Sequence, residues 1–209
     1  MKIYSDIVKH YESCLEKHGD SHLGVDWPNL DDAQKRYQIM LDLVRPKEAD
    51  GENISLLDFG CGTAHLYEYI QNKNLTNLTY TGLDFSEKFT EICEKKYPNV
   101  PFLTGDILDP DFKLGQFDYV VMNGVFTEKR ELSFEQMWEY FKAMIAHTFK
   151  HAQKGIAFNV MSTNVDWERD DLFHLSLDKL TAFLCADLSR NFVIRNDYGL
   201  YEYTVYLYK

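Results

Sequence analysis

Cysteine is scarce in this 209-residue sequence, and its four cysteines lie far apart at Cys14, Cys61, Cys93 and Cys185. There is no Cys-x-x-Cys pair and no histidine at metal-ligand spacing beside them, which disfavours a zinc site. We therefore expect reduced thiols, mostly in the core, and no bound metal.

Long apolar runs are also missing. No stretch approaches the roughly 18 apolar residues of a transmembrane helix, and residues 1–6 contain no apolar signal-peptide core. These absences predict a cytoplasmic protein that does not insert into membranes.

Positive charge is in deficit, with 22 basic residues against 33 acidic ones and a formal net charge of −11. Such a surface repels a phosphate backbone, so nucleic acid is not an expected partner unless a local basic groove overrides the net charge. The expected partner is a small molecule.

The chain is otherwise ordinary for a soluble globular protein, with 45% hydrophobic and 26% charged residues. No composition shift divides it, so we expect a single domain over 1–209. Helical spacing of apolar residues predicts a helical cap over 1–46, with two helices that Pro46 ends, followed by a core over 54–209.

The loop between the two opening helices contains His22 and Trp27 among glycines and aspartates. Trp27 either anchors a surface loop to the core or faces a ligand, and the two readings are about equally supported.

From Ile54 onward, short apolar runs alternate with helical stretches, as in βαβ units with a parallel sheet. The predicted strands are 54–59, 78–84, 100–103, 117–123, 155–160, 192–195 and 201–208. The predicted helices are 64–72, 87–97, 134–150 and roughly 178–188. Residues 196–200 are too few for a parallel crossover, so the last two strands should form an antiparallel hairpin.

Two glycines, Gly60 and Gly62, lie where the first of these strands turns into a helix. A ligand lying against the backbone needs glycine there, although any tight turn could use it. The nicotinamide-dinucleotide pattern would require a third glycine at His65, and no phosphate-binding Gly-Lys-Ser/Thr follows.

Polar residues follow the next three strands, at the edge where α/β folds bind ligands. Asp84 could accept hydrogen bonds from both hydroxyls of a ribose, or could cap the next helix. Asp106 and the amide of Ile107 could contact adenine, or Asp106 could be a turn residue. Asn123 and Gly124 end the fourth strand. Residues suited to binding a ligand thus follow all four strands.

These four stretches resemble the successive motifs of class I S-adenosylmethionine-dependent methyltransferases, over about 54–126. The resemblance implies a Rossmann-like α/β fold with a seven-stranded, mostly parallel sheet, an antiparallel last strand and, here, two extra N-terminal helices. It also implies S-adenosylmethionine as cofactor, with S-adenosylhomocysteine as product. Ala64 departs from the family, which often has a third glycine there.

The resemblance assigns each motif a part of the cofactor. Asp58, Gly60 and Gly62 would lie beside the methionine part, Asp84 on the ribose, and Asp106 and Ile107 on the adenine. Asn123, Gly124 and Val125 would line the floor near the sulfonium, and Phe85 completes the expected cofactor-binding set.

A second resemblance, carried by 18–27, 157–159, 168–174 and 196–204, is to small bacterial methyltransferases of surface-polysaccharide biosynthesis. It implies a sugar, a nucleotide-linked sugar or a phosphate-type group as acceptor, in capsule formation.

Methyl transfer from a sulfonium depends mainly on positioning, and a general base is optional. His174 and Tyr198 are the candidate catalytic residues, and Arg169, Tyr201, His22 and Trp27 the candidate substrate contacts. Each of these side chains could instead be structural. Two alternatives remain for the whole chain: a non-catalytic S-adenosylmethionine-binding partner subunit, and an NAD-dependent oxidoreductase.

Overall fold

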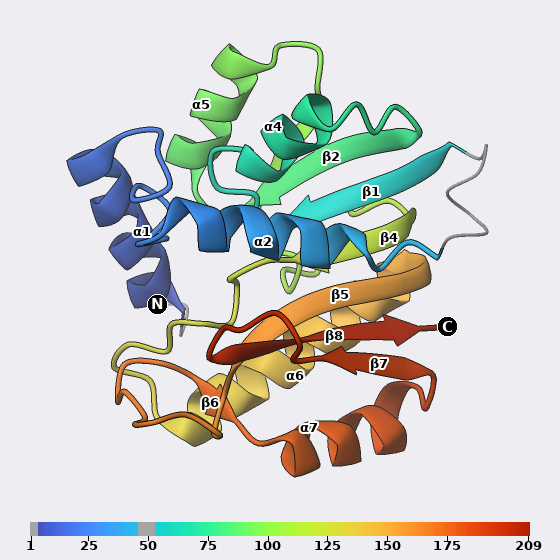
Figure 1. The fold of residues 1–209 in the computed structure, drawn as a ribbon. Helices are drawn as coiled ribbons and strands as arrows, with labels where there is room; N and C mark the ends of the chain where they lie inside the picture. The colour runs from blue at the N-terminus through green and yellow to red at the C-terminus, as the bar shows by residue number, and fades with distance from the viewer. Residues whose placement is uncertain (1–3, 46–52) are drawn as a thin grey trace.

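The computed structural model describes residues 4–45 and 53–209, and Pro46, at which the second helix was predicted to end, lies outside them. Helix α1 spans Ser5–His18 and α2 spans Leu30–Leu41. The side chain of Asn29 begins α2 by accepting hydrogen bonds from the amides of Asp31 at 2.9 Å and Asp32 at 3.1 Å. Both predicted N-terminal helices are therefore present (Figure 1).

The remaining elements alternate strands and helices as the sequence predicts. In order they are β1 Ile54–Phe59, α4 His65–Asn72, β2 Leu78–Asp84, α5 Glu87–Lys96, β3 Phe102–Thr104, β4 Phe117–Met122, α6 Phe134–His151, β5 Ala152–Ser162, β6 His174–Leu175, α7 Leu177–Phe183, a π-helical turn Leu184–Leu188, β7 Phe192–Arg195 and β8 Glu202–Tyr208. Every helix within the described residues is too short or too polar to span a bilayer.

The central sheet confirms the Rossmann-like prediction. Its strand order is β3-β2-β1-β4-β5-β8-β7, and β6 adds a short parallel pairing beside β5. The strands from β3 to β5 pair in parallel, whereas β8 runs antiparallel to both β5 and β7. Because parallel strands share a direction, β1, β2 and β4 end at the same edge of the sheet.

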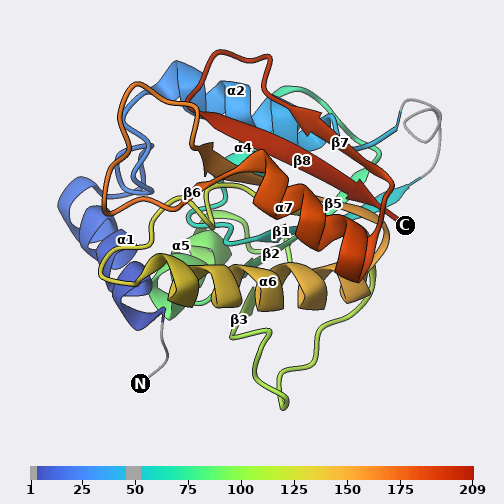
Figure 2. The same ribbon diagram turned by 90° about the horizontal axis from the view of Figure 1, so that it is seen from below.

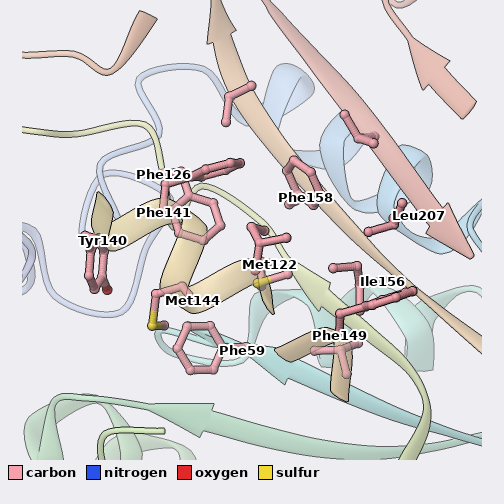
Figure 3. Packing of buried hydrophobic residues seen from close by; sticks show 14 of the residues in the cluster. Phe59, Met122, Phe126, Tyr140, Phe141, Met144, Phe149, Ile156, Phe158 and Leu207 are labelled. Carbon is pink, nitrogen blue, oxygen red and sulfur yellow. The ribbon is translucent and has the colours of Figure 1, made fainter. Parts of the chain in front are cut away.

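Two hydrophobic cores lie on opposite faces of this sheet. Successive residues of β1 point to opposite faces of the sheet and belong to different cores. Leu56 belongs to the core that includes residues of α2 and α4, and Leu57 to the core that includes residues of α6 and α7. Figures 1 and 2 show α2 and α6 on opposite sides of the sheet. On the α6 side, the ring of Phe141 lies 4.8 Å from that of Phe126 and 5.5 Å from that of Phe158, centroid to centroid (Figure 3).

Strand boundaries differ from the predictions by two or three residues at the starts of β3 and β5, and by one or two residues at the end of β4, the start of β8 and the ends of β3 and β5. Pro101 has no amide hydrogen to donate to a neighbouring strand, and its carbonyl only accepts a hydrogen bond, from the Gly82 amide at 3.0 Å. Strand β3 therefore begins at Phe102 rather than at residue 100. Strand β5 begins at Ala152, directly after α6, because residues 152–154 already lie along β4.

Candidate functional site

A cavity of about 920 Å³, including its open mouth, lies at the carboxyl ends of β1, β2 and β4. The turns after these strands form its floor, while α1 and the loop 19–28 form much of its wall. Ligand sites of doubly wound α/β folds occur at this edge.

Backbone without side chains forms part of the cavity floor. Gly60 and Gly124 have φ angles of +75° and +79°, which residues with a Cβ rarely adopt. A Cβ on Gly60 would come within 2.6 Å of Val125, and one on Gly124 within 2.6 Å of the Trp27 ring. Both positions therefore require glycine, because Val125 and the Trp27 ring fill the space that a side chain would need.

Asp84 lies at the end of β2 and is held by backbone amides. Its two carboxylate oxygens accept hydrogen bonds from the Gly62 amide at 3.0 Å and the Ser86 amide at 2.9 Å. Burial raises the pKa of Asp84 to about 6, against the lowering effect of these amides. Each oxygen retains a second lone pair with which it can accept from a ligand hydroxyl.

Asp58 is a second carboxyl in the cavity and is only 3% exposed. Tyr80 donates a hydrogen bond to it at 2.7 Å. Burial raises the pKa of Asp58 to about 7, the hydrogen bond from Tyr80 opposes this rise, and the charge of Asp84 adds to it. The two acids make the cavity attractive to a cation.

Asn123 and Gly124 follow β4 along the cavity floor. The side-chain oxygen of Asn123 is buried and has no hydrogen-bond partner within residues 4–45 and 53–209. An unpaired buried acceptor is costly, so a donor on a bound ligand is the natural partner for this oxygen.

A buried polar chain fixes the Gly124 backbone. The Gly124 amide donates to Asn159 Oδ1 at 2.7 Å, and Asn159 Nδ2 donates to Glu202 at 2.9 Å. Arg36 donates its Nε to both carboxylate oxygens of Glu202 at 2.9 Å, and its guanidinium lies 4.2 Å from the centre of the Trp27 ring. Helix α2 and the last strand together thus position the floor and Trp27.

Aromatic side chains of α1 and the residue before it close the cavity from above. The ring of Tyr4 stacks on Phe85 at 4.9 Å, and its hydroxyl donates to Asp106. The hydroxyl of Tyr11 donates to the Gly124 carbonyl at 3.3 Å.

Most of the predicted cofactor residues line this one cavity: Asp58, Gly60, Gly62, Asp84, Phe85, Asn123, Gly124 and Val125. Asp106 and Ile107 are not among the described residues that line the cavity. Asp106 lies behind Tyr4, and Ile107 is buried in the core. Trp27 lines the cavity, and His22 supports it by donating from Nδ1 to the Trp27 carbonyl at 2.6 Å.

Three residues predicted for the acceptor line a second hollow of about 500 Å³: Arg169, His174 and Tyr201. The backbone amide of Arg169 donates to Nε2 of His174 at 3.1 Å, and Nδ1 of His174 donates to the Ser162 carbonyl at 2.7 Å. The guanidinium of Arg169 is paired with Asp171 at 2.6 Å.

Tyr198 lies apart from both spaces within the described chain. It is buried, and its hydroxyl is hydrogen-bonded to Thr204 at 2.9 Å. Its catalytic role, like that of His174, stays a prediction.

Sequence reasoning missed the α1 residues of the cavity and one side-chain cluster. Tyr11 sits in an apolar stripe that is indistinguishable from a core-facing stripe. The premise that no histidine stands at metal-ligand spacing from a cysteine was wrong, because His10 and Cys14 are four residues apart on α1 and converge with Asp26.

Replacing Asp84 with alanine is expected to weaken S-adenosylhomocysteine binding by about 2 kcal/mol, roughly 30-fold, through loss of a charged acceptor. Calorimetric titration measures the loss. Asp109→Ala is the control, because its side chain caps an exposed turn at the Asp111 amide. Equal affinities for the Asp84 variant and the unmodified protein would refute the role.

A family model described as "Methyltransferase domain" matches residues 56–148, which contain most of β1, all of β2 to β4 and most of α6. A protein of Mycobacterium tuberculosis strain H37Rv, designated a candidate methyltransferase, is 24% identical over 160 residues, covering 74% of this chain and 93% of that protein.

Solved structures share the fold. Magnesium protoporphyrin IX methyltransferase from Synechocystis PCC 6803, with bound S-adenosylmethionine, superposes with a TM-score of 0.69 at 17% identity over 100% of this chain and 98% of that one. An amino pentose methyltransferase from Micromonospora echinaspora, also with bound cofactor, superposes with a TM-score of 0.55 at 16% identity over 95% and 96% of the two chains. These findings favour a methyltransferase over a nicotinamide-dependent oxidoreductase.

Proposed function

We propose that this S-adenosylmethionine-dependent methyltransferase acts on a small polar acceptor of carbohydrate type, a sugar or a nucleotide-linked sugar. The capsule-related role implied by the second sequence resemblance is kept as part of this proposal. The choice of acceptor rests on one observation. The hollow beside β5, β6 and the loop before β8 is lined by two exposed aromatic rings.

The cofactor cavity supports a specific arrangement of S-adenosylmethionine. Asp84 would accept from the ribose hydroxyls, Asp58 would attract the ammonium of the methionine part, and Asn123 Oδ1 would accept from a donor on the cofactor. Gly60 and Gly124 also line this cavity. Asp106 would act on the adenine end through Tyr4, with which it is hydrogen-bonded.

The cofactor supplies a methyl group made electrophilic by its sulfonium. The protein then has to place the acceptor oxygen in line with the methyl–sulfur bond and keep water out. Tyr11, held against the Gly124 carbonyl, and Trp27, packed on Gly124, would shape the wall at this point. The acceptor oxygen would take up the methyl group and release its proton to a base or to water.

The second hollow supports a carbohydrate. Trp167 is 72% exposed and Tyr201 57% exposed, and both line it. Exposed aromatic rings offer apolar faces on which the C–H groups of a sugar can pack, and Asp166, which accepts from the Tyr201 hydroxyl at 2.6 Å, offers hydrogen-bond acceptors to its hydroxyls.

The charge balance of the hollow favours a neutral sugar ring over a bare phosphate. The Arg169 guanidinium that would clamp a phosphate is engaged with Asp171, and Asp166 adds a negative charge. A nucleotide-linked sugar remains within the proposal, with its sugar seated here.

Replacing Trp167 with alanine is expected to lower kcat/KM for the carbohydrate acceptor by about ten-fold, the cost of one stacking contact of about 1.4 kcal/mol. Affinity for S-adenosylmethionine should not change, since Trp167 does not line the cofactor cavity within the described chain. The measurement is methylated product by mass spectrometry across sugars, nucleotide-linked sugars and phosphorylated compounds.

Val193→Ala is the control for Trp167→Ala, because it also removes an exposed apolar side chain, on strand β7 away from both spaces. Unchanged kcat/KM in the Trp167 variant would place the acceptor elsewhere. If no panel member is methylated while the cofactor binds, the proposed acceptor class is wrong.

A further inference from the structure

Three side chains of different chemistry converge at the rim of the cofactor cavity. His10 and Cys14 come from α1, and Asp26 comes from the loop that follows it. One donor atom of each lies within 4.8 Å of the others. Nε2 of His10 is 2.8 Å from Asp26 Oδ2 and 3.9 Å from Cys14 Sγ.

The backbone holds these three groups in place. His10 and Cys14 are four residues apart, so they lie one above the other on the same face of α1. Asp26 has a φ angle of +60°, and its amide donates to the Leu23 carbonyl at 3.1 Å in a tight turn. The Trp27 amide secures the same turn by donating to the His22 carbonyl at 2.7 Å.

A further carboxylate lies close to the cluster. Glu128 is buried and lies near Cys14. It is paired with Arg130 at 3.2 Å.

We propose that His10, Cys14 and Asp26 bind one zinc-class divalent ion, which ties α1 to the loop 19–28. A donor set of one imidazole nitrogen, one thiolate and one carboxylate suits zinc, whereas magnesium and calcium require oxygen ligands. Three protein ligands leave a fourth position to water. Binding displaces the Cys14 thiol proton to solvent and moves the His10 proton from Nε2 to Nδ1.

Two of the three ligand separations need little adjustment to hold the ion. Tetrahedral zinc with bonds of about 2.0 to 2.3 Å places its nitrogen, oxygen and sulfur ligands roughly 3.3 to 3.6 Å apart. The His10–Asp26 separation of 2.8 Å has to widen, and the His10–Cys14 separation of 3.9 Å has to shorten, each by about half an ångström.

The site would couple metal binding to the cofactor. Tyr11 of α1 and Trp27 of the loop both line the cofactor cavity, and each lies next to a ligand in the sequence. An ion that joins the two segments holds two walls of the cavity together. The proposal does not depend on the identity of the methyl acceptor.

The test is titration of the chelator-treated full chain with Co²⁺, whose bond to a thiolate gives a near-ultraviolet charge-transfer band. We expect one Co²⁺ per chain with this band, and competition by Zn²⁺. Cys14→Ser should abolish the band and weaken affinity by at least about 100-fold, since even outer-shell partners are worth 10 to 100-fold.

Cys185→Ser is the matched control, because both cysteines are half-buried free thiols, and it should keep the band. Folding of each variant is verified by metal-free binding of S-adenosylhomocysteine, which should be unchanged. Should Cys14→Ser fail to fold, Asp26→Asn gives the second test, with a retained band and weakened Co²⁺ affinity. No thiolate band in the unmodified protein, or a band that survives in Cys14→Ser, overturns the proposal.

Discussion

Replacing Arg36 with alanine is expected to lower the free energy of unfolding by about 3 to 5 kcal/mol, because it leaves the buried carboxylate of Glu202 without its cation. Glu202 is 2% exposed, and Arg36 donates hydrogen bonds to both of its carboxylate oxygens at 2.9 Å. Denaturant unfolding followed by circular dichroism measures the loss.

The control for Arg36→Ala is Arg195→Ala. Arg195 pairs with Asp197 at 2.7 Å, but Asp197 is exposed, so the expected loss is about 0 to 1 kcal/mol. The double variant Arg36→Met/Glu202→Gln, which removes both charges together, should recover most of the stability lost in Arg36→Ala. A loss in Arg36→Ala no larger than in Arg195→Ala would contradict a structural role for the buried pair.

Affinity for S-adenosylmethionine should rise about 100-fold as the pH increases from about 5 to about 7, at roughly ten-fold per pH unit for one linked proton. The cofactor is a cation, and it favours the ionised form of Asp58, whose pKa burial raises to about 7. Asp84, with a pKa raised to about 6, should steepen the dependence below that pH.

Stability of the ligand-free protein should change in the opposite direction. The folded pKa of Asp58, about 7, lies above its ordinary value of 3.8. The folded state therefore binds a proton more tightly than the unfolded state between these values, so the free energy of unfolding decreases as the pH rises through that window.

Two variants test the assignment to Asp58. Asp58→Asn should remove most of the pH dependence between 6 and 7 in both measurements, since Asp58 is the group with a pKa of about 7. Tyr80→Phe deletes the hydrogen bond that lowers the pKa of Asp58. In this variant the pH at which cofactor affinity stops rising should therefore be higher. If the pH dependence persists unchanged in Asp58→Asn, it arises from another group.

The sheet could be predicted from the sequence because its evidence is local. Each strand is a short apolar run, and the connection 196–200 is too short for anything but a hairpin. Strand β6 could not be predicted, because a two-residue strand at His174–Leu175 has no periodicity.

The cavity floor was predictable for a topological reason. Parallel strands end at one edge, so Asp58, Asp84 and Asn123 had to meet there. The same reasoning predicted that Arg169, His174 and Tyr198 would surround this cleft as well. Arg169 and His174 line the second hollow instead, and both ring nitrogens of His174 are hydrogen-bonded to backbone. Tyr198 lines neither space, because chain direction places a loop at an edge but does not say which way its side chains point.

The attachment of α1 bears on how a bound cofactor is exchanged. Beyond its apolar face, α1 is held by the hydrogen bond from Tyr11 to the Gly124 carbonyl at 3.3 Å and by one from Ser86 to Glu12 at 2.6 Å. Ion pairs of Lys88 with Glu12 at 2.9 Å and Glu16 at 2.7 Å lie at its surface, where such pairs contribute about 0 to 1 kcal/mol each. Because α1 forms part of the cavity wall, we expect exchange of a bound cofactor to require displacement of this helix, at a cost well below that of unfolding the sheet.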